Sequence, residues 1–263
     1  MLLILEKMLS KNKIKLIRSL GLKKNRSDEG LFVAEGKKLV FDLIASKLSL
    51  REIFCTREIA VELVTVKADK ITELKEGKME RISSLKSTPE VIALFEIPAM
   101  VFNWENIKDD LCLVLDSVQD PGNLGTIVRL ADWFGIKTII CSEDCADLYN
   151  PKTVQATMGA IARVNVQYLS LSDFLSQAVK LKIPVYGTFL EGENLFLTEL
   201  TSNGIVVMGS EGKGISPQIE ALISKKINIP SYPLTNSGSE SLNVAVAASI
   251  VCAEFRRRII CKA

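Results

Sequence analysis

The 263-residue chain contains no histidine. This absence excludes Ser-His-Asp catalysis, Cys-His catalysis and every zinc site that uses imidazole. A site of cysteines and carboxylates stays open, but the six cysteines are scattered and form no C-x-x-C pair. They favour reduced thiols in a cytoplasmic protein. We therefore expect no metal, and chemistry that uses carboxylate, hydroxyl, amide or guanidinium groups or an organic cofactor.

Long apolar runs are also missing. No segment approaches the roughly 18 consecutive apolar residues that a membrane-spanning helix requires. The short apolar start, Leu2–Leu5, is interrupted by Glu6 and is followed by no small-residue cleavage site. The sequence therefore predicts neither a membrane span nor a secretory signal.

Acidic residues are absent from the stretch between Lys11 and Arg26, and a second basic cluster, Arg256–Arg258 with Lys262, closes the chain. Such clusters are typical of polyanion binding, although a solvated helix face is the alternative for each one. We predict that the first stretch binds nucleic acid. Its basic residues are Lys11, Lys13, Lys15, Arg18, Lys23, Lys24 and Arg26.

The pattern over residues 1–97 predicts a small α/β unit. We expect helices over residues 6–20, 37–46, 71–74 and 79–85, and strands over residues 31–34, 52–56, 62–66 and 91–95. Residues 98–110 change in composition, with Pro98, Asn103 and the pair Asp109-Asp110, and predict a linker.

From Leu111 to the C-terminus, strand and helix patterns alternate. The predicted strands cover residues 111–115, 137–141, 164–168, 184–188, 204–208 and 227–229. The predicted helices cover residues 126–134, 151–160, 171–181, 216–223 and 241–258. This alternation predicts a parallel sheet with helices on both faces, and a ligand site beyond the carboxyl ends of its strands.

A glycine-rich turn around Glu211 follows the strand that ends at Met208. Gly209, Gly212 and Gly214 let a ligand approach the backbone closely. The spacing fits neither the P-loop nor the dinucleotide fingerprint. The turn therefore predicts a ligand site of another kind, although a solvent-facing glutamate is the alternative for Glu211.

Four further polar residues stand near predicted helix starts. Arg129 lies six residues after Asn123, and its guanidinium could hold a phosphate, although an ordinary surface arginine is the alternative. Ser241 and Asn243 open the last helix, where capping is the simple role for Ser241. Asn243 is expected inside the helix start, where capping explains it less easily.

Three segments together resemble the motifs of the SpoU (TrmH) family, which are RNA ribose 2′-O-methyltransferases of the SPOUT class. They are Asp116–Arg129, Gly209–Ser216, and Ile229-Pro230 with Ser241–Ala248. Met158-Gly159-Ala160 matches an intermediate segment of the family. This resemblance covers Leu111 to the C-terminus. Ser10–Phe95 is similar to the L30e-like RNA-binding domain of many members.

The resemblance implies a homodimer that binds S-adenosylmethionine in a C-terminal trefoil knot. By the family pattern, the cofactor is held at Thr188, Gly209, Ile229 and Leu242. The implied catalytic residues are Asn123, Arg129, Glu211, Ser241 and Asn243. One departure is the connection Ser231–Glu240, which is longer than usual and affects the expected shape of the cofactor loop.

The expected function is S-adenosylmethionine-dependent methylation of a ribose 2′-hydroxyl in 23S ribosomal RNA. Such a transfer needs positioning but neither metal nor histidine. A guanidinium is not readily a base, so we expect Arg129 to clamp a phosphate and to lower the hydroxyl pKa electrostatically. Glu211 would orient Arg129 or Asn123. The alternatives are a tRNA ribose methyltransferase and a catalytically silent RNA-binding protein on the same scaffold.

Overall fold

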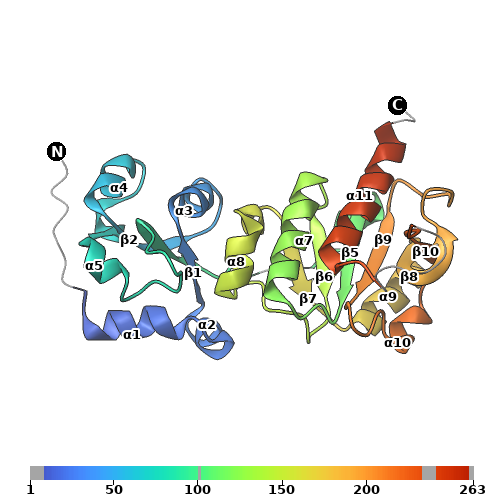
Figure 1. Cartoon of the computed structure of the whole chain (residues 1–263), viewed down its shortest axis with the longest axis horizontal. Helices are drawn as coiled ribbons and strands as arrows, with labels where there is room; N and C mark the ends of the chain where they lie inside the picture. Colours follow the sequence, from blue (N-terminus) through green and yellow to red (C-terminus); the bar gives the residue numbers. More distant parts are fainter. Residues whose placement is uncertain (1–8, 100–101, 233–240, 261–263) are drawn as a thin grey trace. The chain divides into compact units, whose positions relative to one another are not determined.

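A computed structural model describes residues 9–99, 102–232 and 241–260 (Figure 1). The chain divides into two compact units, one of residues 1–99 with 147–162 and one of residues 100–146 with 163–263. The predicted domains, 1–97 and 111–263 around a linker 98–110, stay a prediction, but residues 147–162 group with the first unit. Within the described ranges, no helix is long and apolar enough to cross a membrane.

The first unit is built on a four-stranded sheet in the order β1-β4-β2-β3. Strand β4 runs antiparallel to β1 and β2, and β3 runs parallel to β2. Phe32, Phe54 and Phe95 are fully buried in this unit. Its elements are α1 (Lys11–Ser19), α2 (Lys23–Glu29), β1 (Leu31–Glu35), α3 (Lys37–Ile44), β2 (Leu50–Cys55), α4 (Arg57–Glu62), η1 (Ala68–Lys70), β3 (Ile71–Glu73), α5 (Glu76–Met79), β4 (Val91–Glu96), α8 (Pro151–Thr157) and η2 (Ala160–Ala162).

Three predictions for the first unit are wrong. Residues 71–73 form strand β3 where a helix over residues 71–74 was predicted, because a strand of three residues is too short to show a period. Residues 62–66 form no strand. The β-branched residues of this segment suggested one, but Val64 is 84% exposed and is not part of a sheet. Helix α5 ends at Met79, where a helix over 79–85 was expected to begin.

The segment 147–162 packs against β1 and α3 of the first unit. The ring of Tyr149 lies 5.0 Å from that of Phe32. Gly159 has a φ of +90°, and a Cβ there would lie 3.1 Å from the side chain of Asp42. The close approach explains why a glycine stands at this position.

The second unit is built on a six-stranded parallel sheet in the order β10-β8-β9-β5-β6-β7, which confirms the predicted fold class. The knot expected from the last strands and the final helix stays a prediction, and residues 233–240 of the long connection Ser231–Glu240 lie outside the described residues. The elements of this unit are α6 (Glu105–Lys108), β5 (Leu111–Asp116), α7 (Pro121–Trp133), β6 (Thr138–Cys141), β7 (Asn165–Tyr168), α9 (Leu171–Lys180), β8 (Val185–Asn194), β9 (Gly204–Gly209), α10 (Pro217–Glu220), β10 (Lys225–Asn228) and α11 (Val244–Ile260).

Both faces of this sheet are covered, as its uninterrupted apolar strands predict. All six residues of β5 are buried. Cys112 and Val114 share a core cluster with Phe174 and Leu175 of α9. Helices α7 and α11 pack side by side, α7 against β6 and α11 against β9 (Figure 1). Burial on two faces fixes the strands whose carboxyl ends form the site.

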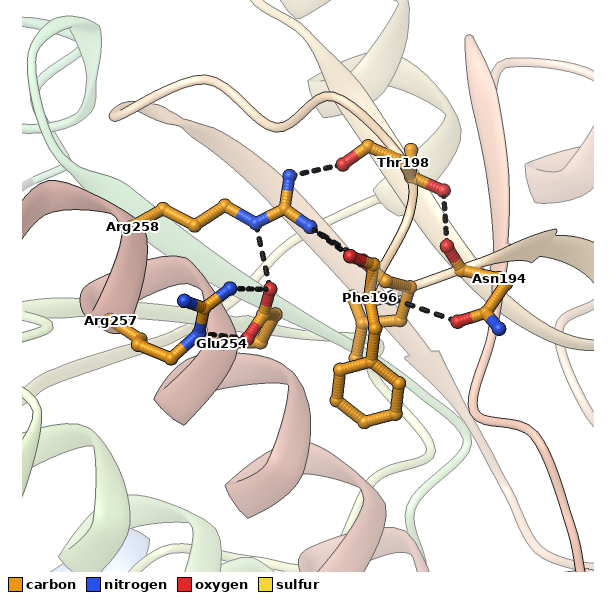
Figure 2. Close-up of polar contacts among 7 residues, drawn as sticks. Asn194, Phe196, Thr198, Glu254, Arg257 and Arg258 are labelled. Carbon is orange, nitrogen blue, oxygen red and sulfur yellow. Dashed lines mark hydrogen bonds and ion pairs between the residues drawn. The ribbon is translucent and has the colours of Figure 1, made fainter. Parts of the chain in front are cut away.

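A buried carboxylate holds the C-terminal half of α11 (Figure 2). Glu254 accepts hydrogen bonds from Arg257 at 2.7 Å and from Arg258 at 2.7 Å, and these arginines lower the pKa of Glu254 to about 2. Arg258 also donates to the backbone oxygens of Phe196 and Thr198. The side chain of Arg258 therefore fixes α11 to the turn that follows β8.

The polyanion-binding prediction for the C-terminal arginines is not supported by these contacts. Arg256 donates to the backbone oxygen of Phe134 at 2.7 Å and pairs with Asp110 at 2.9 Å. Arg256 and Arg258 thus make contacts within the fold. The sequence alone does not distinguish such arginines from a basic surface patch. Lys262 lies outside the described residues.

Candidate functional site

One carboxylate oxygen joins three separate segments of the second unit. Glu211 Oε1, in the turn after β9, accepts from Asn123 Nδ2 at 3.1 Å, from the backbone N–H of Val244 at 3.1 Å, and from Asn243 Nδ2. Asn243 Nδ2 also donates to Asn123 Oδ1 at 2.9 Å. We call Asn123, Glu211 and Asn243 the amide–carboxylate cluster. Glu211 contacts the amide of Asn123, one of the two partners expected for it.

The turn that presents Glu211 is folded tightly onto the end of β9. The backbone N–H of Gly214 donates to the oxygen of Ser210 at 2.8 Å. A Cβ on Gly209 would lie 2.1 Å from the carbonyl carbon of Gly214, so only glycine fits there. At the far end of the turn, Asp116 Oδ2 at the end of β5 accepts from the backbone N–H of Ser216 at 2.7 Å. The turn is therefore held at both ends.

Capping residues place the two amides of the cluster. Asp120 caps α7 and accepts from the backbone N–H of Asn123 at 2.7 Å. Asn243 caps α11, since its Oδ1 accepts from the backbone N–H of Ala245 at 3.0 Å. Capping, the simple alternative for Ser241, is thus done by Asn243, and the predicted helix start at Ser241 is wrong, since α11 begins at Val244. Because the helix starts later than predicted, Asn243 both caps α11 and contacts Glu211.

Helix α7 begins at Pro121, five residues before the predicted start at Thr126. Asn123 therefore lies in the first turn of the helix rather than in the preceding loop. Asp120 followed by Pro121 is a helix-start pattern that sequence reading could have used.

All four residues expected to hold the cofactor line one pocket of about 670 Å³. Strand β8 loses its register with β10 between Gly187 and Glu193, and Thr188–Glu191 form one wall. Glu211 and Ser241 also line it. The volume lies in the range of pockets that take small-molecule cofactors, about 300–1,000 Å³. The four expected residues are Thr188, Gly209, Ile229 and Leu242.

A second hollow of about 260 Å³ adjoins this pocket. It is lined by Ser117–Asp120 and Asn123 on one side. Ser210–Lys213 and Val244 line both hollows. The two spaces therefore meet at the Glu211 turn, an arrangement suited to a cofactor and a second reactant held side by side.

Arg129 stands apart from the cluster. It is exposed on α7, six residues after Asn123, which is about 9 Å along the helix axis. It lines neither hollow. Within residues 9–99, 102–232 and 241–260 its side chain makes no hydrogen bond or ion pair. The structure thus brings together Asn123, Glu211 and Asn243, puts Ser241 on the pocket wall, and leaves Arg129 on the surface.

The basic stretch of the first unit divides into surface and internal residues. Lys13 pairs with Glu52 at 2.6 Å, and Arg18 Nε donates to the backbone oxygen of Arg81 at 2.7 Å. Both keep part of their surface exposed. Four lysines are exposed, namely Lys11, Lys15, Lys23 and Lys24.

The RNA-binding prediction for Arg26 is wrong. This residue is only 2% exposed. Its guanidinium pairs with Asp147 and donates to the backbone oxygen of Leu20 at 2.7 Å. The ion pair joins α2 to the segment 147–162. The run of basic residues in the sequence gives no sign of this contact.

Sequence reading missed a polar network beside the smaller hollow. Ser117 has a φ of 58°, and its backbone N–H donates to Ser142 Oγ at 2.9 Å. Asp144 accepts from the hydroxyls of Ser117 and Ser142 at 2.6 and 2.5 Å. These bonds join the loops after β5 and β6. Asp116, which accepts from the Ser117 hydroxyl at 3.3 Å, also belongs to this network. It is the one member that the sequence marks, because it is an acidic residue at the end of an apolar strand.

Residues 110–253 match the model of the SpoU rRNA Methylase family. The chain belongs to this family. Residues 11–93 match the MRM3-like substrate binding domain. The resemblance of the three motifs is therefore confirmed.

Similar proteins span nearly the whole length of this SpoU family member. It is 27% identical over 245 residues to the 23S rRNA (guanosine(2553)-2′-O)-methyltransferase RlmP of Bacillus subtilis, covering 93% of this chain and 96% of that one. A solved structure from Porphyromonas gingivalis, described as a candidate RNA methyltransferase of the TrmH family, is 40% identical with a TM-score of 0.87, covering 96% of this chain and 100% of that one.

An AdoMet-bound rRNA methyltransferase from Sinorhizobium meliloti bears on the cofactor. It is 27% identical to this SpoU family member, with a TM-score of 0.84, and the match covers 96% of this chain and 97% of that one. The larger pocket fits such a cofactor in volume, and the turn that is folded tightly at Gly209 forms part of its wall. In the part of the chain that the structure describes, no three cysteine or acidic side chains group as metal ligands.

Replacing Gly209 by alanine should abolish cofactor binding while the domain stays folded. The new Cβ would lie 2.1 Å from backbone that cannot move aside without opening the turn. Binding of S-adenosylhomocysteine by calorimetry, with circular dichroism for folding, measures this. The matched control is Gly212→Ala, since a Cβ at Gly212 meets nothing within 4 Å. Equal losses in the two variants would contradict the crowding argument.

Proposed function

We propose that this chain is an S-adenosylmethionine-dependent methyltransferase that acts on a ribose 2′-hydroxyl of 23S ribosomal RNA. The observation that supports this most is the amide–carboxylate cluster at the border of the two hollows, made from all three family motifs. A relative that matches 93% of this chain is a 23S rRNA 2′-O-methyltransferase. The cytoplasm is the proposed location, because the bacterial relatives act on an RNA that is made there.

Bound in the larger pocket, the cofactor supplies an electrophilic methyl group to an oxygen nucleophile. Thr188, Gly209, Ile229 and Leu242 hold it by this proposal, and the tight turn keeps the pocket wall in place. Most of the acceleration then comes from positioning. No histidine or metal is required for this step.

The cluster orients the ribose in the smaller hollow. Glu211 Oε1 is already occupied by three N–H donors. We therefore assign Glu211 the role of fixing the side-chain amides of Asn123 and Asn243. Asn123 lines the smaller hollow and keeps one amide N–H that can donate to the substrate. Fixed amides cost no reorganisation when the substrate arrives.

Arg129 has the role of a phosphate clamp in this proposal. A guanidinium stays protonated in proteins and cannot readily remove a proton. Its planar fork suits a phosphate, and a positive charge beside the ribose favours the ionised hydroxyl. The exposed lysines of α1 and α2 in the first unit supply further contacts to the RNA backbone.

The function is tested with tritiated S-adenosylmethionine and separate pools of tRNA, naked ribosomal RNA and ribosomal subunits. We expect label in ribosomal RNA, at one linkage that resists alkaline cleavage because its 2′-oxygen is methylated. Label confined to tRNA would contradict the ribosomal substrate and show that tRNA is methylated instead. Cofactor binding without label in any pool would favour a silent RNA-binding protein.

We also propose that the enzyme works as a homodimer in which Arg129 reaches the cluster of a second copy. The support is that Arg129 is exposed, about two helical turns from Asn123, and lines neither hollow of its own chain. In a two-fold symmetric dimer each site would then receive one arginine from the partner.

Mixed dimers test this arrangement. A copy with Arg129→Ala and a copy with Glu211→Ala are co-expressed with different tags and purified as heterodimers, with each variant homodimer as control. If Arg129 acts across the interface, the heterodimer keeps one complete site and about half of the wild-type rate. An inactive heterodimer, or a protein that sediments as a monomer, would contradict the proposal.

A further inference from the structure

The position of Lys213 is fixed by the turn that also presents Glu211. Its backbone N–H donates to Ser210 Oγ at 3.3 Å, and the next residue, Gly214, forms a bridge with Ser210. Lys213 is exposed and lines both hollows. The glycine-rich turn therefore presents a positive charge as well as a carboxylate.

Lys213 is the cation of the smaller hollow. The other charged residues that line it are Asp120 and Glu211, and both carboxylates are engaged with the protein. The larger pocket is lined by one more lysine, Lys226, which pairs with Glu220 and lies 4.8 Å from the ring centre of Phe189. Lys226 is thus already neutralised, whereas Lys213 makes no ion pair with a carboxylate in the described residues.

The charge of Lys213 acts on the side of the smaller hollow. The hydroxyls of Ser117 and Ser142, and to a lesser degree the charge of Lys213, lower the pKa of Asp144. Ser117 itself lines the smaller hollow. Both oxygens of Asp144 accept hydrogen bonds from these hydroxyls, and in the described residues no ion pair forms between Asp144 and Lys213.

We propose that Lys213 binds a phosphate of the RNA next to the target ribose and so sets the affinity for the substrate. This inference rests on the proposed function. A ribose that enters the smaller hollow brings a phosphate on each side, into a space where the fixed side chains Asp120 and Glu211 are acidic. A lysine at its rim supplies the opposite charge that an RNA backbone needs there.

The test compares Lys213→Gln with Lys213→Arg, and Lys180→Gln serves as the matched control on the exposed end of α9. We expect Lys213→Gln to raise the KM for naked 23S ribosomal RNA about tenfold with little change in kcat, and Lys213→Arg to restore it. The plot of log kcat/KM against log salt concentration has a negative slope, and this slope should become shallower by about 0.7 for one lost contact to single-stranded RNA. The control should match wild type.

Two further readouts separate the ways in which this can fail. Calorimetry with S-adenosylhomocysteine should show unchanged affinity in Lys213→Gln; a large loss would mean that Lys213 holds the cofactor instead, which overturns the inference. Unchanged KM and salt slope would overturn it as well. Filter binding of RNA is measured alongside. Wild-type protein that binds RNA but transfers no methyl group would count against the proposed function. RNA binding by Lys213→Gln with the same salt dependence as wild type would count against the role of Lys213.

Discussion

The hydrogen bonds to Glu211 Oε1 hold together segments that are far apart in the chain. Asn123 and Asn243 are separated by 120 residues, yet both amides meet at this one oxygen. Two of the three donors, Asn243 Nδ2 and the backbone N–H of Val244, come from the start of α11, and the third, Asn123 Nδ2, comes from α7. The site therefore depends on the sheet that brings the ends of β5 and β9 and the start of α11 to one edge.

The backbone around this oxygen allows few alternatives. Asp116 and Gly209 are register partners at the ends of β5 and β9. From there Asp116 binds the far end of the turn at Ser216, and Gly209 lets the turn fold back on the strand. Glu211 and Lys213 stand two residues apart in the same short loop, and both line the two hollows. A rigid loop of this kind suits a reaction that relies on positioning.

The sequence predicted the features that rest on a local, periodic pattern. It did not predict those that depend on a contact between residues far apart in the chain. Alternating strands and helices predicted the parallel sheet, and motif segments predicted residues that the structure places around one pocket. Strand β3 was missed because three residues show no period. Arg26 and Arg256 appeared to be surface charges because their partners, Asp147 and Asp110, lie more than 100 residues away in the chain. Asn243 was misplaced because a cap depends on where the helix begins.

The central claim is that Asn123 and Glu211 act as one unit. Single-turnover methyl transfer by Asn123→Ala, Glu211→Gln and the double variant tests it most directly, under saturating cofactor and RNA. If the two side chains form one device, the double variant should be no more than about twofold slower than the slower single variant. Losses that multiply in the double variant would show two independent contributions and contradict the account.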